Sequence, residues 1–130
     1  MMQRIKNFFC KKSQPKTLDF TGRNIDGFVP KTSVFYDASA ETTQHLVKHG
    51  FIHIGLVPTS IVNLHLANNN LECISENWFD SLVNLEFLDV SANKIASIDY
   101  KAFEQCKRLV KLDVSHNALK HVALSIVVHR

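Results

Sequence analysis

The 130-residue chain has few cysteines, and their spacing excludes the usual cysteine-based sites. Cys10, Cys73 and Cys106 cannot all pair with one another, and no two of them lie close enough in sequence to form a zinc-binding or redox motif. A bridge between Cys73 and Cys106 would require Cα atoms within about 7 Å, and we expect none. Cys106 is interpreted as a small buried residue rather than a reactive thiol.

Long apolar runs and glycosylation acceptors are also absent. No stretch approaches the roughly 18 apolar residues that a transmembrane helix requires. The apolar centre of the amino terminus, Phe8 to Cys10, is shorter than the about 7 to 15 residues of a secretory signal. No Asn-x-Ser/Thr acceptor occurs, although asparagine is frequent. These absences argue against a secreted product.

Positive charge is concentrated at the amino terminus. The chain carries a net charge of +3, but five of its 15 basic residues precede the first acidic residue, Asp19. Residues 17–130 therefore hold 10 basic and 12 acidic side chains, a net charge of −2 (10 − 12). We predict a basic flexible tail over residues 1–16 and no nucleic-acid binding by the remainder.

An eleven-residue pattern occurs three times between Ile61 and Leu119. The copies read IVNLHLANNNL, LEFLDVSANKI and LVKLDVSHNAL, and their fourth positions are Leu64, Leu88 and Leu112, which gives a period of 24 twice (88 − 64 and 112 − 88). Positions 1, 4, 6 and 11 are apolar, and position 9 is asparagine. Apolar residues that alternate with polar ones indicate a half-buried strand. A regular period of this length indicates stacked repeats.

This pattern resembles the leucine-rich repeat superfamily. The resemblance extends beyond the strand, because apolar residues recur 3, 8 and 11 positions after the eleventh: Ile74, Phe79, Leu82, Ile98, Phe103 and Cys106. A phenylalanine in this slot with a 24-residue period resembles the subclass common in animal extracellular and cell-surface receptors. The resemblance implies an α/β solenoid, a fragment of a leucine-rich repeat horseshoe with parallel concave strands and short helical or irregular convex segments.

The asparagines at position 9 predict a structural ladder. An amide side chain has donors and an acceptor, so at the bend after each strand it can satisfy backbone groups of its own coil and of the neighbouring one. We expect Asn69, Asn93 and Asn117 to be buried and structural, since buried polar groups are normally hydrogen-bonded.

The domain is predicted to span residues 17–130, with three regular repeats over 61–130. Residues 17–30 read as a degenerate first repeat, in which Leu18 and Phe20 fill positions 4 and 6 and Arg23 replaces the asparagine. This segment also resembles the end of the amino-terminal cap of extracellular leucine-rich repeat proteins. Phe20 stands where such a cap has a cysteine, so a disulfide-bonded cap is not expected.

Residues 31–60 fit no register and are interpreted as one longer, irregular repeat. We expect a strand at Val34 to Tyr36, a helix over Ala40 to His49 that Gly50 ends, and a second strand from Phe51 to Val57. Further along, Trp78 is either a surface aromatic on the convex side or wedged between coils.

Three histidines at four-residue intervals form the one grouping that could carry chemistry. Two histidines one helical turn apart, such as His45 and His49, can bind zinc when a third ligand is supplied. His53 follows at the same interval and could be that ligand. Gly50, however, should end the helix before His53, and no acidic residue lies between His45 and His53 to act as a base. We predict no metal and no cofactor, and a metal-dependent enzyme is the least favoured function.

The concave strand positions supply the candidate partner-binding residues. Phe87 is expected to be exposed and is the best anchor, because binding energy concentrates on a few aromatic or arginine residues in a polar surround. The alternative for the aspartates and the serines that follow them is support of the turns after the strands. The candidate set is Asn63, His65, Phe87, Asp89, Lys111, Asp113 and His116.

The function favoured is non-catalytic recognition of a protein partner, in a receptor-like or innate-immune protein. An intracellular scaffold or regulator built on the same repeats is the alternative. The repeat subclass favours an extracellular or cell-surface location, whereas the missing signal and glycosylation sites favour the cytoplasm. No polar capping segment follows the last repeat, so we expect a fragment of a longer array and self-association through the carboxyl-terminal repeat.

Overall fold

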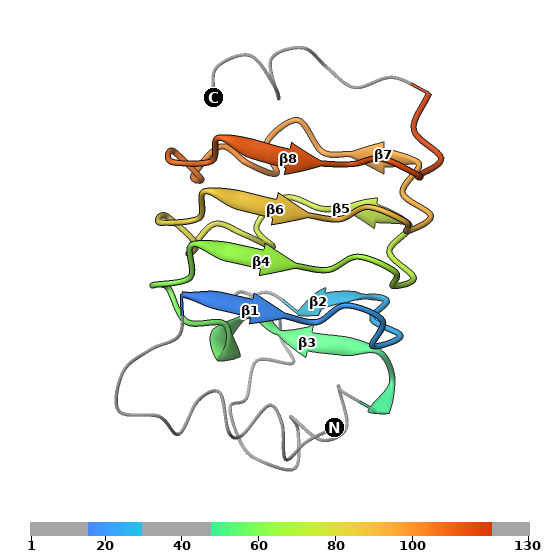
Figure 1. Ribbon diagram of the computed structural model, residues 1–130, viewed down its shortest axis with the longest axis horizontal. Coiled ribbons are helices and arrows are strands. Elements are labelled where there is room, and N and C mark those ends of the chain that lie inside the picture. The colour runs from blue at the N-terminus through green and yellow to red at the C-terminus, as the bar shows by residue number, and fades with distance from the viewer. Residues whose placement is uncertain (1–15, 30–47, 121–130) are drawn as a thin grey trace.

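The computed structural model describes residues 16–29 and 48–120, which form stacked coils of one solenoid (Figure 1). Each coil contributes one strand to a four-stranded parallel sheet with the order β1-β4-β6-β8. Leu64 lies opposite Leu88, and Leu88 lies opposite Leu112, so one 24-residue period is one coil. The strands are β1 (Thr17–Asp19), β4 (Asn63–His65), β6 (Phe87–Asp89) and β8 (Lys111–Asp113). We call the solvent side of this sheet the concave face.

The opposite side of the solenoid is formed by strands of two or three residues that run in the reverse direction (Figure 1). Here β5 (Cys73–Ile74) pairs with β7 (Ser97–Ile98), and β2 (Gly27–Val29) pairs with β3 (Phe51–His53), both in parallel. Tight turns connect these strands to the next coil, as where the Leu82 N–H donates to the Phe79 carbonyl at 3.0 Å. The architecture is the α/β solenoid that the repeat pattern predicts.

The core lies between the two sides and is filled by the repeat's apolar positions. Leu64, Leu66, Leu88 and Val90 are fully buried because strand positions 4 and 6 both point inward. Apolar residues that lie 3, 8 and 11 positions after each eleven-residue pattern pack against these strand residues from the convex side. Ile98 is half-buried, and the other five are buried: Ile74, Phe79, Leu82, Phe103 and Cys106.

An aromatic column runs through the convex half of the core. The ring of Phe79 stacks on Phe103, with centroids 6.0 Å apart, and meets Phe28 edge-on at 5.6 Å. Trp78 packs against Phe28 at 5.4 Å and is 8% exposed, so it is wedged between coils and is not a surface aromatic. The column links three successive coils, and its residues come from segments far apart in sequence.

The first two strands of the concave sheet are separated by a longer segment than the others. β1 pairs directly with β4, and Leu18 lies opposite Leu64 although they are 46 residues apart (64 − 18). The described part of residues 31–60 adds no strand to the concave sheet between them, and it supplies β3 beside β2 instead. The interpretation of residues 31–60 as one longer, irregular repeat stays a prediction, as do the domain boundaries.

The end of this long segment also differs from the expected strand. β3 stops at His53, and a short 3-10 turn, η1 (Ile54–Leu56), replaces the rest of the strand predicted to reach Val57. The His53 Nδ1 atom accepts a hydrogen bond from the Gly55 N–H at 3.1 Å, which stabilises the turn. Gly50, with φ +85°, precedes β3, and a Cβ there would meet an Asp26 carboxylate oxygen at 2.8 Å. The strand at Val34 to Tyr36 and most of the helix from Ala40 lie outside the described residues.

Position 8 of every coil has a left-handed backbone conformation. The φ values are +66° at Gly22, +56° at Asn68, +54° at Ala92 and +56° at His116. Glycine and asparagine adopt this conformation readily, whereas alanine pays a steric penalty without a polar side chain to offset it. Of the four position-8 residues, Ala92 is therefore the one that least favours this conformation.

We expect Ala92→Gly to raise the free energy of unfolding by about 0.5 kcal/mol, since relief of about 1 kcal/mol of left-handed strain exceeds the added unfolded-state entropy of glycine. Ala96→Gly is the matched control, because Ala96 lies in the same coil, is exposed and has no positive φ. That control should lower stability by about the same amount. Urea unfolding measures the stability changes of both variants. If both variants gained stability or both lost it, the strain attributed to Ala92 would be contradicted.

Candidate functional site

Two rows of side chains cover the strands of the concave face. In-register pairing places position 3 of each coil in one row and position 5 in the other. Neighbouring strands lie about 4.8 Å apart, so adjacent members of a row are within contact distance. We call these eight residues the concave surface: Thr17, Asn63, Phe87 and Lys111 in the first row, and Asp19, His65, Asp89 and Asp113 in the second.

Six of the seven predicted partner-binding residues belong to this surface. The seventh, His116, is exposed at the left-handed bend after β8. Thr17 and Asp19 are not among the predicted residues, because their repeat is degenerate. The register of Leu18 with the other position-4 leucines was the signal that could have placed both of them.

Phe87 is half-buried because side chains from both neighbouring strands pack on it. The imidazole of His65 meets its ring at a tilt of 75°, with centroids 5.3 Å apart. From the other side, the Nζ atom of Lys111 lies 5.0 Å from the ring centroid. A cation near an aromatic face is attracted by the ring's negative face. The aromatic group expected to be exposed is thus held in place between an imidazole and an ammonium group.

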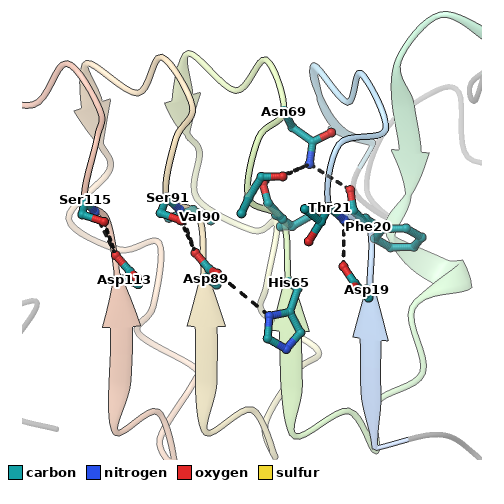
Figure 2. Close-up of polar contacts among 12 residues, drawn as sticks. Asp19, Phe20, Thr21, His65, Asn69, Asp89, Val90, Ser91, Asp113 and Ser115 are labelled. Atoms are coloured by element: carbon teal, nitrogen blue, oxygen red, sulfur yellow. Dashed lines mark hydrogen bonds and ion pairs between the residues drawn. The ribbon is translucent and has the colours of Figure 1, made fainter.

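His65 also lies beside a carboxylate. Its Nδ1 atom is 4.0 Å from the Oδ2 atom of Asp89, with the two side chains 30% and 20% exposed (Figure 2). Asp19 lies opposite His65 on the other neighbouring strand. The coil of His65 carries Ala67 two residues later, where the other three coils carry serine or threonine. His65 is therefore directed toward its neighbours and not into its own turn.

The three aspartates each use one carboxylate oxygen to support the turn that follows. Oδ1 of Asp113 accepts hydrogen bonds from the Ser115 hydroxyl at 2.7 Å and from the Ser115 N–H at 3.0 Å (Figure 2). Asp89 accepts the same pair from Ser91. Asp19 accepts the Thr21 N–H at 2.9 Å. These bonds match the turn-supporting alternative, and in Asp89 the other oxygen faces His65.

The turn bonds also change the acidity of two carboxyls. The Ser115 hydroxyl, and then the Ser115 N–H, lower the pKa of Asp113. The Thr21 hydroxyl and N–H lower the pKa of Asp19 in the same way, and the charges of His65 and Arg23 add to this effect. A depressed folded-state pKa stabilises the folded protein above the unfolded pKa, and this stability is lost as the pH falls through the folded pKa.

We expect Ser115→Ala to raise the pKa of the Asp113 carboxyl toward its ordinary value of 3.8. The variant should be less stable than the wild type at neutral pH, and the difference should shrink as Asp113 is protonated in both proteins. NMR titration of the carboxyl carbon and urea unfolding at neutral and acidic pH measure these two effects. Ser97→Ala, an exposed serine on β7, is the control and should leave the pKa of Asp113 unchanged.

The position-9 asparagines bind the backbone of two coils at once. The Asn69 amide donates to the carbonyls of Phe20 and Leu66 at 2.9 and 3.0 Å, and its Oδ1 accepts the Ile25 N–H at 3.0 Å (Figure 2). Asn93 and Asn117 repeat this arrangement one and two coils later. Asn69 and Asn93 are 6% and 9% exposed, whereas Asn117 is half-buried. These contacts are structural.

The histidines at four-residue intervals are not brought together as a metal site in the described residues. His49 is exposed, whereas His53 is buried at the end of β3, and His45 lies outside the described part of the chain. Within residues 16–29 and 48–120, no group of three histidine, cysteine, aspartate or glutamate side chains could hold a metal ion.

The two described cysteines have separate environments. Cys73 is exposed, whereas Cys106 is fully buried. The Sγ atom of Cys106 lies 3.4 Å from the Phe79 carbonyl oxygen and completes the inner packing of its coil.

The described ranges also contain no helix of the length and apolar character that a bilayer crossing requires.

Comparison with known proteins agrees with this geometry. The family model described as leucine rich repeat matches residues 59–123, which is half of the chain. This chain belongs to the leucine-rich repeat family. The family assignment explains the common coil, and the similar proteins are leucine-rich repeat proteins of the animal extracellular and receptor type.

Similar leucine-rich repeat proteins cover different lengths of the chain. Chicken lumican is 37% identical over an alignment of 122 residues, and the match covers 88% of this chain and 35% of lumican. Bovine osteomodulin is 41% identical over 64 residues, which are 49% of this chain and 15% of osteomodulin. The solved structure of the Toll–Spatzle complex of Drosophila has 34% identity and a TM-score of 0.47, covering 52% of this chain and 9% of the matched chain. The chain thus spans about a third or less of the length of these relatives.

Proposed function

We propose that this chain recognises a protein partner through its concave surface and does so without catalysis. The observation that carries the proposal is the setting of Phe87, an aromatic side chain that remains half-buried on a solvent-facing sheet and is surrounded by polar residues. An aromatic anchor within a polar surround is the usual composition of a binding hot spot. The relatives of the animal extracellular and receptor type support protein interaction as the general role.

We further propose a receptor-like role, of the kind found in innate immunity, in preference to an intracellular scaffold. The support is the receptor-type relative, the Drosophila protein Toll, which is 30% identical over 82 residues and matches 62% of this chain. The alternative scaffold role rests only on sequence features that are missing. The partner and the activity of the whole protein are part of this proposal, since the chain spans a minor share of each relative.

Selection from a displayed library of random peptides, followed by mapping of the selected binders, tests the proposed surface. We expect Phe87→Ala to weaken binding by about tenfold or more and Asn63→Arg to obstruct the same surface. Tyr100→Ala is the matched control, because Tyr100 is 75% exposed outside the concave surface. Binders that respond to Tyr100→Ala and ignore both concave variants, or a library without concave-dependent binders, would contradict the proposal.

A further inference from the structure

The concave surface has the opposite charge to the chain as a whole. Its eight residues include three aspartates, one lysine and one histidine, so with neutral histidine they carry a net charge of −2 (1 − 3). The whole chain carries +3. Other charged residues lie just beyond the strands: Lys16 before β1, Glu86 before β6, and Arg23 and Lys94 a few residues after β1 and β6. The negative charge thus lies on the strands themselves, whereas three of these four flanking residues are basic.

The two side chains of this surface that can be cationic are both directed at groups of the surface itself. Lys111 places its Nζ over the ring of Phe87 at 5.0 Å, and its charge also acts on Asp113 of the same strand. His65 places its Nδ1 at 4.0 Å from the Asp89 Oδ2, the carboxylate oxygen that the turn does not use (Figure 2). The face of an aromatic ring and a free carboxylate oxygen are the two places where an incoming cation would bind most favourably.

We propose that the concave surface binds a protein segment that carries arginine or lysine side chains, and that Lys111 and His65 are internal competitors for that segment. This inference rests on the proposed function and adds the chemistry of the partner. The sheet face is complementary in charge to such a segment, and Phe87 supplies the apolar contact at its centre. The partner's cation displaces Lys111 from the ring, because the lysine side chain is long and turns away at little cost.

The test uses two labelled peptides and fluorescence anisotropy at low salt. One is a twelve-residue peptide that alternates arginine with serine, and the other replaces each arginine with glutamate. A chain of net charge +3 would favour the glutamate peptide if only its overall charge mattered. We expect the arginine peptide to bind more tightly. The opposite order, or no binding of the arginine peptide, overturns the inference.

The sign of the Lys111 effect is the sharpest test. Lys111→Ala should strengthen binding of the arginine peptide by about threefold or more, because it removes a competing cation. Lys101→Ala removes the same charge outside the concave surface and should change the affinity by less than about twofold. Weaker binding by Lys111→Ala overturns the inference, since the lysine would then contact the ligand. Circular dichroism confirms that each variant is folded.

A variant of His65 gives an independent readout. His65→Asn should strengthen binding of the arginine peptide by about twofold or more, because it removes the imidazole that faces the Asp89 Oδ2 atom. His49→Asn, at an exposed position outside the concave surface, should leave the affinity unchanged. Weaker binding by His65→Asn overturns the role of His65. Library binders that require the concave surface but are acidic would leave the proposed function standing and overturn the cationic partner.

Discussion

Phe79→Ala is expected to lower the free energy of unfolding by about 4 kcal/mol, the usual cost of emptying a fully buried phenylalanine site. Phe79 has no exposed surface and contacts Phe28, Trp78 and Phe103. These rings come from three coils, so the cavity would remove the ring contacts that join the three coils at the centre of the aromatic column. The rigid backbone of stacked coils limits collapse into the space. The loss would be a large share of a typical stability of about 5 to 15 kcal/mol.

Urea unfolding of Phe79→Ala and Val83→Ala tests this prediction. Val83 lies four residues further along and is 48% exposed, so its truncation should cost less than about 0.5 kcal/mol. A variant of Phe79 that unfolds at the same urea concentration as the Val83 variant would show that the aromatic column does not hold the coils together.

Asn93→Ala should cost about 3 kcal/mol, because it leaves several buried backbone groups without partners. The Asn93 Oδ1 accepts the Leu71 N–H at 3.0 Å, and its amide donates to the carbonyls of Leu66 and Val90 at 3.0 and 2.9 Å. These groups belong to two coils, so the substitution weakens the connection between them. Alanine creates little cavity relative to this effect, and the loss is mainly one of hydrogen bonds.

A series of asparagine variants separates hydrogen bonding from volume. Asn93→Asp keeps the size and the acceptor but cannot donate when ionised, so we expect a loss comparable to that of Asn93→Ala. Asn117→Ala, at a half-buried position, should cost less than Asn93→Ala. Asn70→Ala, one residue after the ladder in the second coil, should cost below about 1 kcal/mol. Thermal and urea unfolding give these differences, and equal losses at Asn93 and Asn70 would exclude the ladder as the cause.

The candidate site was only partly accessible from the sequence. The repeat identified which residues share a row, since position 3 of every coil falls on the same line across the sheet. It did not identify which side chains contact one another within the rows. Phe87 was expected to be exposed, but side-chain packing from His65 and Lys111 covers it in part. Such contacts depend on side-chain conformations in neighbouring coils, which a one-dimensional pattern does not specify.

The sequence by itself determined the regular coils. Each coil contacts mainly the next one, so a tertiary contact in this fold is a fixed offset of 24 residues, and a pattern that repeats at that offset specifies the strands, the register and the buried leucines. Only the tertiary structure decided how strands pair across the part of the chain where the pattern is broken. Leu18 pairs with Leu64 across 46 residues (64 − 18), and the described part of the intervening segment supplies β3 on the convex side and no strand of the concave sheet. The tertiary structure also decided the burial of Trp78 against Phe28. The strand pairing and this burial both depend on contacts between distant segments, and no repeat in the sequence indicates those contacts.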